Sequence, residues 1–152
     1  MSDYRPPLDD IRLVLAEISD LAAICDLPGY EHVDPETVDG VLDELGRFVA
    51  EVVAPVNRIG DEEGCSVTDG VVSAPEAFGT AWDKFVESGW AAISQDPDYG
   101  GGGFPGSVQT VLTELLATAS RAWSMGPMLT VGALDALHSF ADEGQKETYL
   151  PK

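Results

Sequence analysis

The sequence predicts an all-α fold of five or six helices. Apolar residues recur at three- and four-residue steps along much of the 152-residue chain, which is the spacing of helices that bury one face. Proline and glycine interrupt this spacing at several points and divide it into separate helices. The stretch that favours an extended backbone, Val71-Val72, is short. We find no internal repeat and no second domain.

The first two helices are predicted on either side of a proline–glycine break. A helix over about residues 8–22 is indicated by apolar side chains at helical spacing, namely Ile11, Leu15, Ile18 and Leu21. After Pro28-Gly29, Asp34-Pro35-Glu36 opens a second helix with a capping aspartate, a proline at the first helical position and an acid at the positive helix end. Pro55 is expected to end or kink this helix.

The remaining helices follow a loop over residues 58–74 that is rich in glycine and acid. A third helix begins after Pro75-Glu76 and ends at Ser88-Gly89, where the glycine suits a left-handed cap. A fourth is defined by apolar positions from Val108 to Ala119 and is apolar over more than half its circumference, so we expect it in the interior. A fifth is predicted from about Met128 to Ala141, and a short sixth from Asp142 to Leu150.

A glycine run separates the third and fourth helices. Gly101, Gly103 and Gly106 match the pattern G-x-G-x-x-G, and a helix follows. A dinucleotide-binding loop also needs a preceding strand in a βαβ unit and an acid at the end of a second strand. Trp90 to Ser94 is a poor strand, and everything downstream is predicted helical. We therefore interpret the run as a flexible surface turn.

The charge excludes several classes of partner. Eight Lys and Arg residues against 27 Asp and Glu give a net charge of −19. This charge repels the phosphates of nucleic acid, anionic lipid and the nucleotide end of coenzyme A. Neither nucleic acid nor a membrane surface is expected as a partner, although a cationic protein partner stays open.

Cysteine usage and the amino terminus indicate a cytoplasmic protein. Cys25 and Cys65 form no C-x-x-C motif, so we expect ordinary thiols of a reducing compartment. The chain begins Met1-Ser2-Asp3-Tyr4-Arg5, without the basic and apolar regions of an export signal. No stretch reaches the ~18 apolar residues of a membrane span.

No catalytic or metal site is predicted from the titratable residues. His32 and His138 are far apart in sequence and have no neighbouring nucleophile, so we expect structural roles for both. The acidic pairs, such as Asp9-Asp10 and Asp142-Glu143, are adjacent in sequence and would not share a helix face, which favours solvated surface.

The segment Trp123–Thr130 has a different composition, with soft apolar side chains, Gly126-Pro127 as a helix break, and a hydroxyl. Methionine adapts to irregular shapes and glycine permits close backbone approach, so the segment could wall an apolar ligand slot. The residues alone favour plain core packing and leave the slot as the alternative.

Several motifs resemble, in order and spacing, the acyl-CoA dehydrogenase amino-terminal domain. Asp98-Tyr99-Gly100-Gly101, Thr113-Glu114-Leu115-Leu116-Ala117, Gln145-Lys146 and Tyr149-Leu150-Pro151-Lys152 are similar to its signature of EYGG, EEL and QK..YLP. The opening Tyr4–Arg12 resembles the extra leader of the branch that includes methylmercaptopropionyl-CoA dehydrogenases. The resemblance covers essentially the whole chain.

The resemblance implies an orthogonal helical bundle and a role in α,β-dehydrogenation of acyl-CoA to trans-enoyl-CoA. Residues 1–34 would be a leader helix and loop, and residues 35–152 the helical domain, with both forming one compact unit. FAD would bind mainly to a middle β-domain and a carboxy-terminal helical domain, and the catalytic glutamate lies in the latter. The residues that match the family's acyl-tail wall are Tyr99, Gly100, Met125, Met128, Leu129, Thr130 and Gly132.

The sequence stops where the β-domain of the family would begin. We therefore expect no catalytic residue, no metal and no cofactor on this chain alone, and we expect FAD and acyl-CoA binding in a full-length enzyme that forms a homo-oligomer. The alternative is a non-catalytic protein-interaction module or subunit derived from the same domain.

Overall fold

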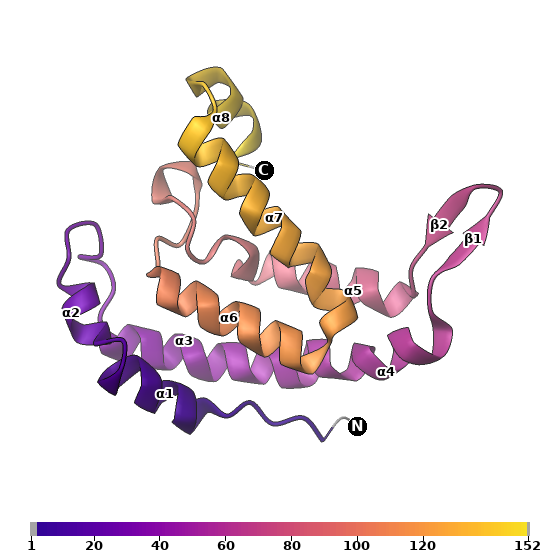
Figure 1. The fold of residues 1–152 in the computed structure, drawn as a ribbon, viewed down its shortest axis with the longest axis horizontal. Coiled ribbons are helices and arrows are strands. Elements are labelled where there is room, and N and C mark those ends of the chain that lie inside the picture. The colour runs from indigo at the N-terminus through magenta and orange to yellow at the C-terminus, as the bar shows by residue number, and fades with distance from the viewer. Residues whose placement is uncertain (1–2, 152) are drawn as a thin grey trace.

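A computed structural model describes residues 3–151, and it confirms the all-α fold (Figure 1). The helices, in chain order, are α1 (Leu8–Glu17), α2 (Leu21–Cys25), α3 (Pro35–Phe48), the π-helical turn η1 (Val49–Val53), α4 (Ala54–Glu63), α5 (Glu76–Glu87), the 3₁₀ turns η2 (Trp90–Ala92) and η3 (Pro97–Tyr99), α6 (Gly106–Ala119), α7 (Arg121–Phe140) and α8 (Glu143–Tyr149). Two short strands, β1 (Ser66–Thr68) and β2 (Val71–Ser73), complete the described elements. No helix in the described part of the chain is long and apolar enough to cross a membrane.

The core is built around one long rod, because α3, η1 and α4 follow one another without a break (Figure 1). α1 packs on one side of this rod, and α6 lies against α3 and η1 on another. The most deeply buried side chains come from this contact and from α5, and they are Leu42, Leu45, Val49, Val53, Phe85, Val108, Leu112 and Leu115. The interior position of α6, which the sequence predicts, is therefore confirmed.

The leader before α3 is attached to the rod through α1. Ile11 and Leu15 are buried, and the Arg12 guanidinium bonds Asp39 and Asp43 of α3 with N–O distances of 2.5 and 2.6 Å. The Tyr4 hydroxyl lies 2.8 Å from the Thr118 hydroxyl of α6. A β-carbon on Gly46 would lie 2.8 Å from a methyl of Leu8, so the glycine allows the leader to approach α3 closely.

The first predicted helix is wrong in one respect, because two helices occupy residues 8–25. Asp20 has a left-handed backbone with φ of 49°, and its carboxylate accepts a hydrogen bond from the Ala23 N–H as the cap of α2. Ile18, predicted on the buried face, is 79% exposed. A short polar side chain tolerates this conformation, which ends α1 and starts α2 in a new direction.

Of the two outcomes expected at Pro55, an end or a kink of the helix, the end does not occur, because helical structure continues to Glu63. The regular α-helix is instead interrupted by the π turn directly before the proline. The Ala54 N–H bonds the carbonyl of Val49, five residues earlier, so the turn before the proline is wider than an α turn. Pro55 then lies at the beginning of α4, where a missing N–H leaves little unpaired.

The segment after α4 forms an antiparallel hairpin that projects from the helical body (Figure 1). Val67 pairs with Val72, and the turn between the strands uses positive φ at Asp69 and Gly70, as tight hairpin turns require. The prediction of an extended Val71-Val72 is thus confirmed. α5 then begins and ends as predicted, with Gly89 in the left-handed conformation.

The fifth predicted helix begins earlier than expected, at Arg121, and Gly126-Pro127 lies inside it. The chain instead breaks at Ser120, whose backbone is extended with φ of −154°. Trp123 is buried and its indole N–H donates to the carbonyl of Phe78 at 3.1 Å, which fixes the first turn of α7 against α5. Tertiary packing of this turn outweighs the helix-breaking tendency of the proline.

Candidate functional site

An apolar cavity of about 190 Å³ lies between α5, α6, α7 and the connecting segment of residues 90–101. Its walls are mainly aromatic and aliphatic. Side chains that line it include Trp82, Phe85, Trp90, Leu112, Leu116, Val131 and Leu134. Ligand sites in proteins are commonly about 300–1,000 Å³ and largely apolar with a few polar groups. By size, this cavity would hold one apolar part of a ligand.

One wall of the cavity is a single face of α7. Ser124, Pro127 and Met128, Val131, Leu134 and His138 all line it, and they follow one another at steps of three or four residues. Side chains at this spacing point to the same side of a helix. Together with Arg121 at the start of the helix, these residues make α7 border the cavity from its first turn to His138.

The glycine run forms part of the opposite wall, and it is a compact turn with extensive backbone bonding. The N–H groups of Gly102 and Gly103 donate to the carbonyls of Ala92 and Gln95 at 2.8 and 2.9 Å. A β-carbon on Gly101 would lie 2.1 Å from the Gln95 carbonyl oxygen, so a side chain cannot fit there. Our expectation of a flexible turn did not foresee this bonding; the glycines allow the backbone to pack against itself.

A strip of polar side chains crosses the cavity wall on α6. The Ser94 hydroxyl donates to the Gln109 amide oxygen at 3.1 Å, and the Gln109 amide nitrogen donates to the Thr113 hydroxyl at 3.3 Å. Gln95, Gln109 and Thr113 all line the cavity. These groups could orient a ligand that carries one polar atom.

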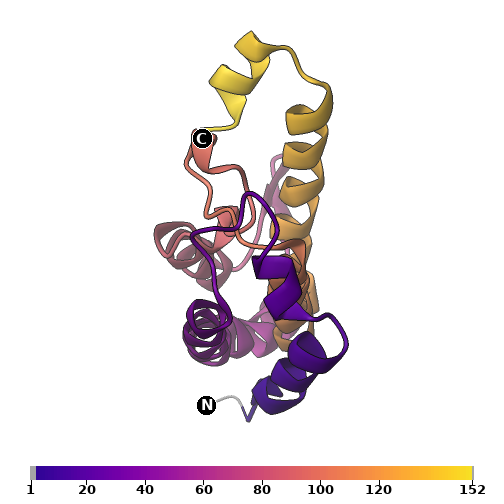
Figure 2. The ribbon, with the colours of Figure 1, turned by 90° about the vertical axis from the view of Figure 1, so that its left-hand side faces the viewer.

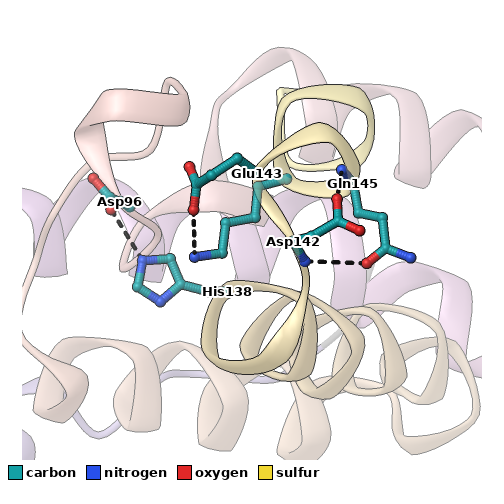
Figure 3. Close-up of polar contacts among 6 residues, drawn as sticks. Asp96, His138, Asp142, Glu143 and Gln145 are labelled. Atoms are coloured by element: carbon teal, nitrogen blue, oxygen red, sulfur yellow. Dashed lines mark hydrogen bonds and ion pairs between the residues drawn. The ribbon is translucent and has the colours of Figure 1, made fainter.

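The two histidines make separate structural contacts. His32, in the loop before α3, lies with Nε2 3.1 Å from the Gly102 carbonyl, so it supports the glycine run from outside. His138 lies with Nε2 3.0 Å from Oδ2 of Asp96 and lines the cavity (Figure 3). Within residues 3–151 no group of His, Cys, Asp and Glu is arranged to hold a metal ion.

Asp96 is the best-connected carboxylate at this end of the cavity. The Asp98 N–H donates to it at 2.9 Å. That bond, the bond from His138 and the nearby charges of His138 and Lys146 together lower the pKa of the Asp96 carboxyl below its usual range, although partial burial opposes the shift. The charged form of Asp96 is therefore favoured in the folded state.

This shift predicts a pH dependence of stability. Since the pKa of Asp96 is lower in the folded state, its contribution is present above the unfolded value of about 3.9 and is lost as the pH falls through the folded value. Urea unfolding from pH 6 to pH 2.5 should show Asp96→Asn destabilised relative to the parent at the upper end, with the gap closing below about pH 4. A gap that stays constant over this range would contradict the assignment.

The structure brings together three of the residues that the sequence assigned to a ligand wall. Tyr99, Met128 and Thr130 line the cavity. The other four, Gly100, Met125, Leu129 and Gly132, are not among its lining residues, and Met125 and Leu129 are 43% and 68% exposed. Met125, Leu129 and Gly132 fall on other faces of α7, because the break expected at Gly126-Pro127 does not occur and the helix sets the direction of every side chain from Arg121 onward.

Sequence reasoning missed the α5 and α6 side of the cavity. The signal was present in the helical spacing of Phe78, Trp82 and Phe85, and of Gln109, Leu112 and Leu116. This spacing predicts two helices, but it does not by itself predict a cavity between them. Some apolar residues of these helices face a cavity, and others face another side chain. The difference depends on how three helices pack together, which the periodic pattern of a single helix does not show.

Comparison with known proteins matches residues 35–152 to the sequence family described as "Acyl-CoA dehydrogenase, N-terminal domain". The chain is also 36% identical over 149 residues to a protein of Ruegeria pomeroyi named 3-methylmercaptopropionyl-CoA dehydrogenase. This alignment covers 98% of the chain and 25% of that relative, so the chain spans about a quarter of the relative's length.

Proposed function

Because this chain belongs to the acyl-CoA dehydrogenase family as its amino-terminal domain, we propose that it forms part of the acyl pocket wall of an FAD-dependent acyl-CoA dehydrogenase. In this proposal the chain shields one side of the acyl tail while α,β-dehydrogenation takes place on other parts of a longer enzyme. The chain by itself is not catalytically competent, and the longer enzyme is a cytoplasmic homo-oligomer.

The observation that carries the proposal is the apolar cavity along α7. Tyr99, Met128 and Thr130, which the family resemblance assigns to the acyl wall, line this cavity together with Trp82 and Leu134. Transfer of an alkyl chain from water to such walls is favourable by roughly 0.8 kcal/mol per buried CH₂. The net charge of −19 disfavours the phosphates of coenzyme A, so the tail is the part of the substrate that this chain would contact.

The residues of this chain do not fit a flavin dinucleotide. The cavity of about 190 Å³ is too small for it. The G-x-G-x-x-G match is also unsuitable, since Gly101 and Gly102 pack against the backbone of Gln95 and Ile93 and leave no room for a pyrophosphate. We therefore assign flavin binding to the parts of a longer enzyme that the chain does not span.

A domain exchange tests the proposal. In the Ruegeria relative, the quarter that aligns with this chain is replaced by residues 3–151. The purified hybrid should be yellow, and addition of acyl-CoA should bleach its flavin. The chain alone should be colourless and should not reduce a dye in the presence of acyl-CoA.

A matched hybrid with Leu134→Glu places a charge in the cavity wall. It should keep its flavin colour and raise KM for acyl-CoA strongly, because a bound acyl tail would cover the new carboxylate without giving it a partner. A folded, yellow hybrid that acyl-CoA never bleaches would contradict the proposal, as would an unchanged KM in the Leu134→Glu hybrid.

A second candidate, a protein-interaction module, is favoured by exposed apolar side chains. Phe140 is 89% exposed, Ile18 79% and Leu129 68%. Exposed apolar surface promotes association between proteins. Sedimentation of the chain at several concentrations distinguishes this module from the acyl-wall proposal. Self-association that is lost in the Phe140→Ser and Leu129→Ser variants would support the module. A strictly monomeric chain would argue against it.

A further inference from the structure

The cavity wall on α7 consists of two halves that are attached very differently. All the buried residues of this helix, Trp123, Ser124 and Pro127, lie in its first seven positions. The thirteen residues from Met128 to Phe140 include none that is buried. A helical segment with so few buried contacts has a low free energy of local opening.

Pro127 marks the boundary between the two halves. It lies inside α7 and has no N–H, so it cannot donate to the carbonyl of Trp123 four residues earlier. Gly126 precedes it and adds no side chain to stiffen the turn. The helix is therefore weakest at the point where its buried contacts end, which is the place where a hinge would form.

α8 follows the loosely attached half, and its ribbon turns back from the end of α7 (Figure 2). The backbone is extended at Ala141, and Asp142 and Gln145 form a capping box that fixes the start of α8 (Figure 3). Lys146 pairs with Glu143 at 3.4 Å and contributes a positive charge near Asp96. Leu150, after α8, lines the cavity. Residues 128–151 thus border the cavity at both of their ends, and we call this segment the lid.

One polar contact joins the lid to the opposite wall among the hydrogen bonds and ion pairs of the described residues. It is the bond between His138 and Asp96, drawn as a dashed line in Figure 3, and both residues line the cavity. Asp96 is held firmly on its side, because its carbonyl accepts from Tyr99 and Gly101 and its carboxylate from Asp98. The contact therefore connects a fixed loop to a loosely attached helix.

We propose that residues 128–151 are a lid that opens about Gly126-Pro127 to admit a ligand to the cavity, and that the His138–Asp96 pair is the latch that holds the lid closed. In this proposal the His138–Asp96 contact controls how often the cavity opens, and it does not determine which ligand the cavity binds. The inference consequently does not depend on the identity of the ligand.

Hydrogen exchange of the 152-residue chain tests the lid. Asp96→Asn and His138→Gln should each raise the exchange rate of amides in residues 128–140 by roughly two- to five-fold, the scale of one partly exposed ion pair. The double variant should show the same increase as either single variant, because the two residues act through one contact. Amides of α6 should keep the parent rates.

Two further measurements keep the test independent of any one variant. When His138 is protonated, the contact is an ion pair, and raising the salt to 1 M, where the Debye length is about 3 Å, should then speed lid exchange in the parent but not in Asp96→Asn. Acrylamide, a neutral quencher, should reach the cavity tryptophans Trp82 and Trp90 more readily in both latch variants. Arg58→Gln, which breaks an exposed ion pair with Glu62 on α4, is the matched control and should leave the lid unchanged.

Lid exchange at the parent rate in both single variants would overturn the proposal. Additive increases in the double variant would also overturn it, because they show that the residues act separately. An equal increase in the exchange rates of α6 and of the lid would show that the His138–Asp96 contact stabilises the whole fold, and it would exclude a lid.

Discussion

Replacing Phe85 with alanine is expected to lower the free energy of unfolding by about 3–5 kcal/mol. Phe85 is 1% exposed, and its ring meets those of Phe48, Trp82 and Trp123 at centroid distances of 6.3, 5.9 and 5.5 Å. Removing the Phe85 ring leaves a cavity. The three neighbouring rings come from three different helices and cannot all move in to fill it. Since domains of this size are stable by only about 5–15 kcal/mol, urea unfolding should show a large loss.

The matched substitution for this experiment is Phe140→Ala. Phe140 is the same residue type on α7 but is 89% exposed, and substitutions at exposed sites usually change stability by no more than about 0.5 kcal/mol. If the two variants unfold at similar urea concentrations, the aromatic cluster around Phe85 is not the centre of the core.

The second large effect is expected from Gly101→Ala. The added β-carbon would lie 2.1 Å from the oxygen and 2.2 Å from the carbon of the Gln95 carbonyl, which are backbone atoms that no side-chain rotation can move. That carbonyl accepts the Gly103 N–H, so the wall between Gln95 and Gly103 must rearrange. We expect a loss of about 1–3 kcal/mol, typical of overpacking, together with stronger acrylamide quenching of tryptophan fluorescence.

Gly106→Ala provides the comparison for this prediction. A β-carbon at Gly106 would meet nothing within 4 Å, and its position at the start of α6 suits alanine. This variant should be as stable as the parent or slightly more stable. Equal behaviour of the two alanine variants would show that the glycine run tolerates side chains and does not need its close backbone packing.

Helix positions were predictable from the sequence where burial and capping agree. α3 begins at the expected Asp34-Pro35, and the Asp34 carboxylate accepts the Thr37 N–H at 2.7 Å. α5 and α8 also begin close to the predicted positions, after Pro75 and after Asp142, although Pro75 makes no side-chain capping bond and the capping box of α8 was not predicted. At Asp34 the signal is local, because a cap involves residues within one turn of each other.

Besides the break at Asp20, the prediction was incomplete at two prolines, and at both of them a distant contact decides the outcome. Pro55 follows a π turn that is packed against α6, and Pro127 lies in a helix whose first turn is fixed by Trp123 against α5. A single sequence shows the proline but not the partner helix. The cavity was predictable only in part for the same reason, since Thr130 and Leu134 share it with Trp82 and Gln95 from other elements.

The π turn at Val49–Val53 has a consequence for how the rod can change length. A turn of this type accommodates one more residue than an α turn, so the rod contains a single inserted position at its middle. Deleting one residue there, such as Ala50, would let the turn return to regular α bonding and leave the two ends of the rod at nearly the same rotation, because the wider turn absorbs the extra residue. Val56, which is 6% exposed, would then still face the interior. The chain can therefore hold one residue more in the rod than a regular helix would, while Val53 and Val56 stay buried at one end and Leu42 and Leu45 at the other.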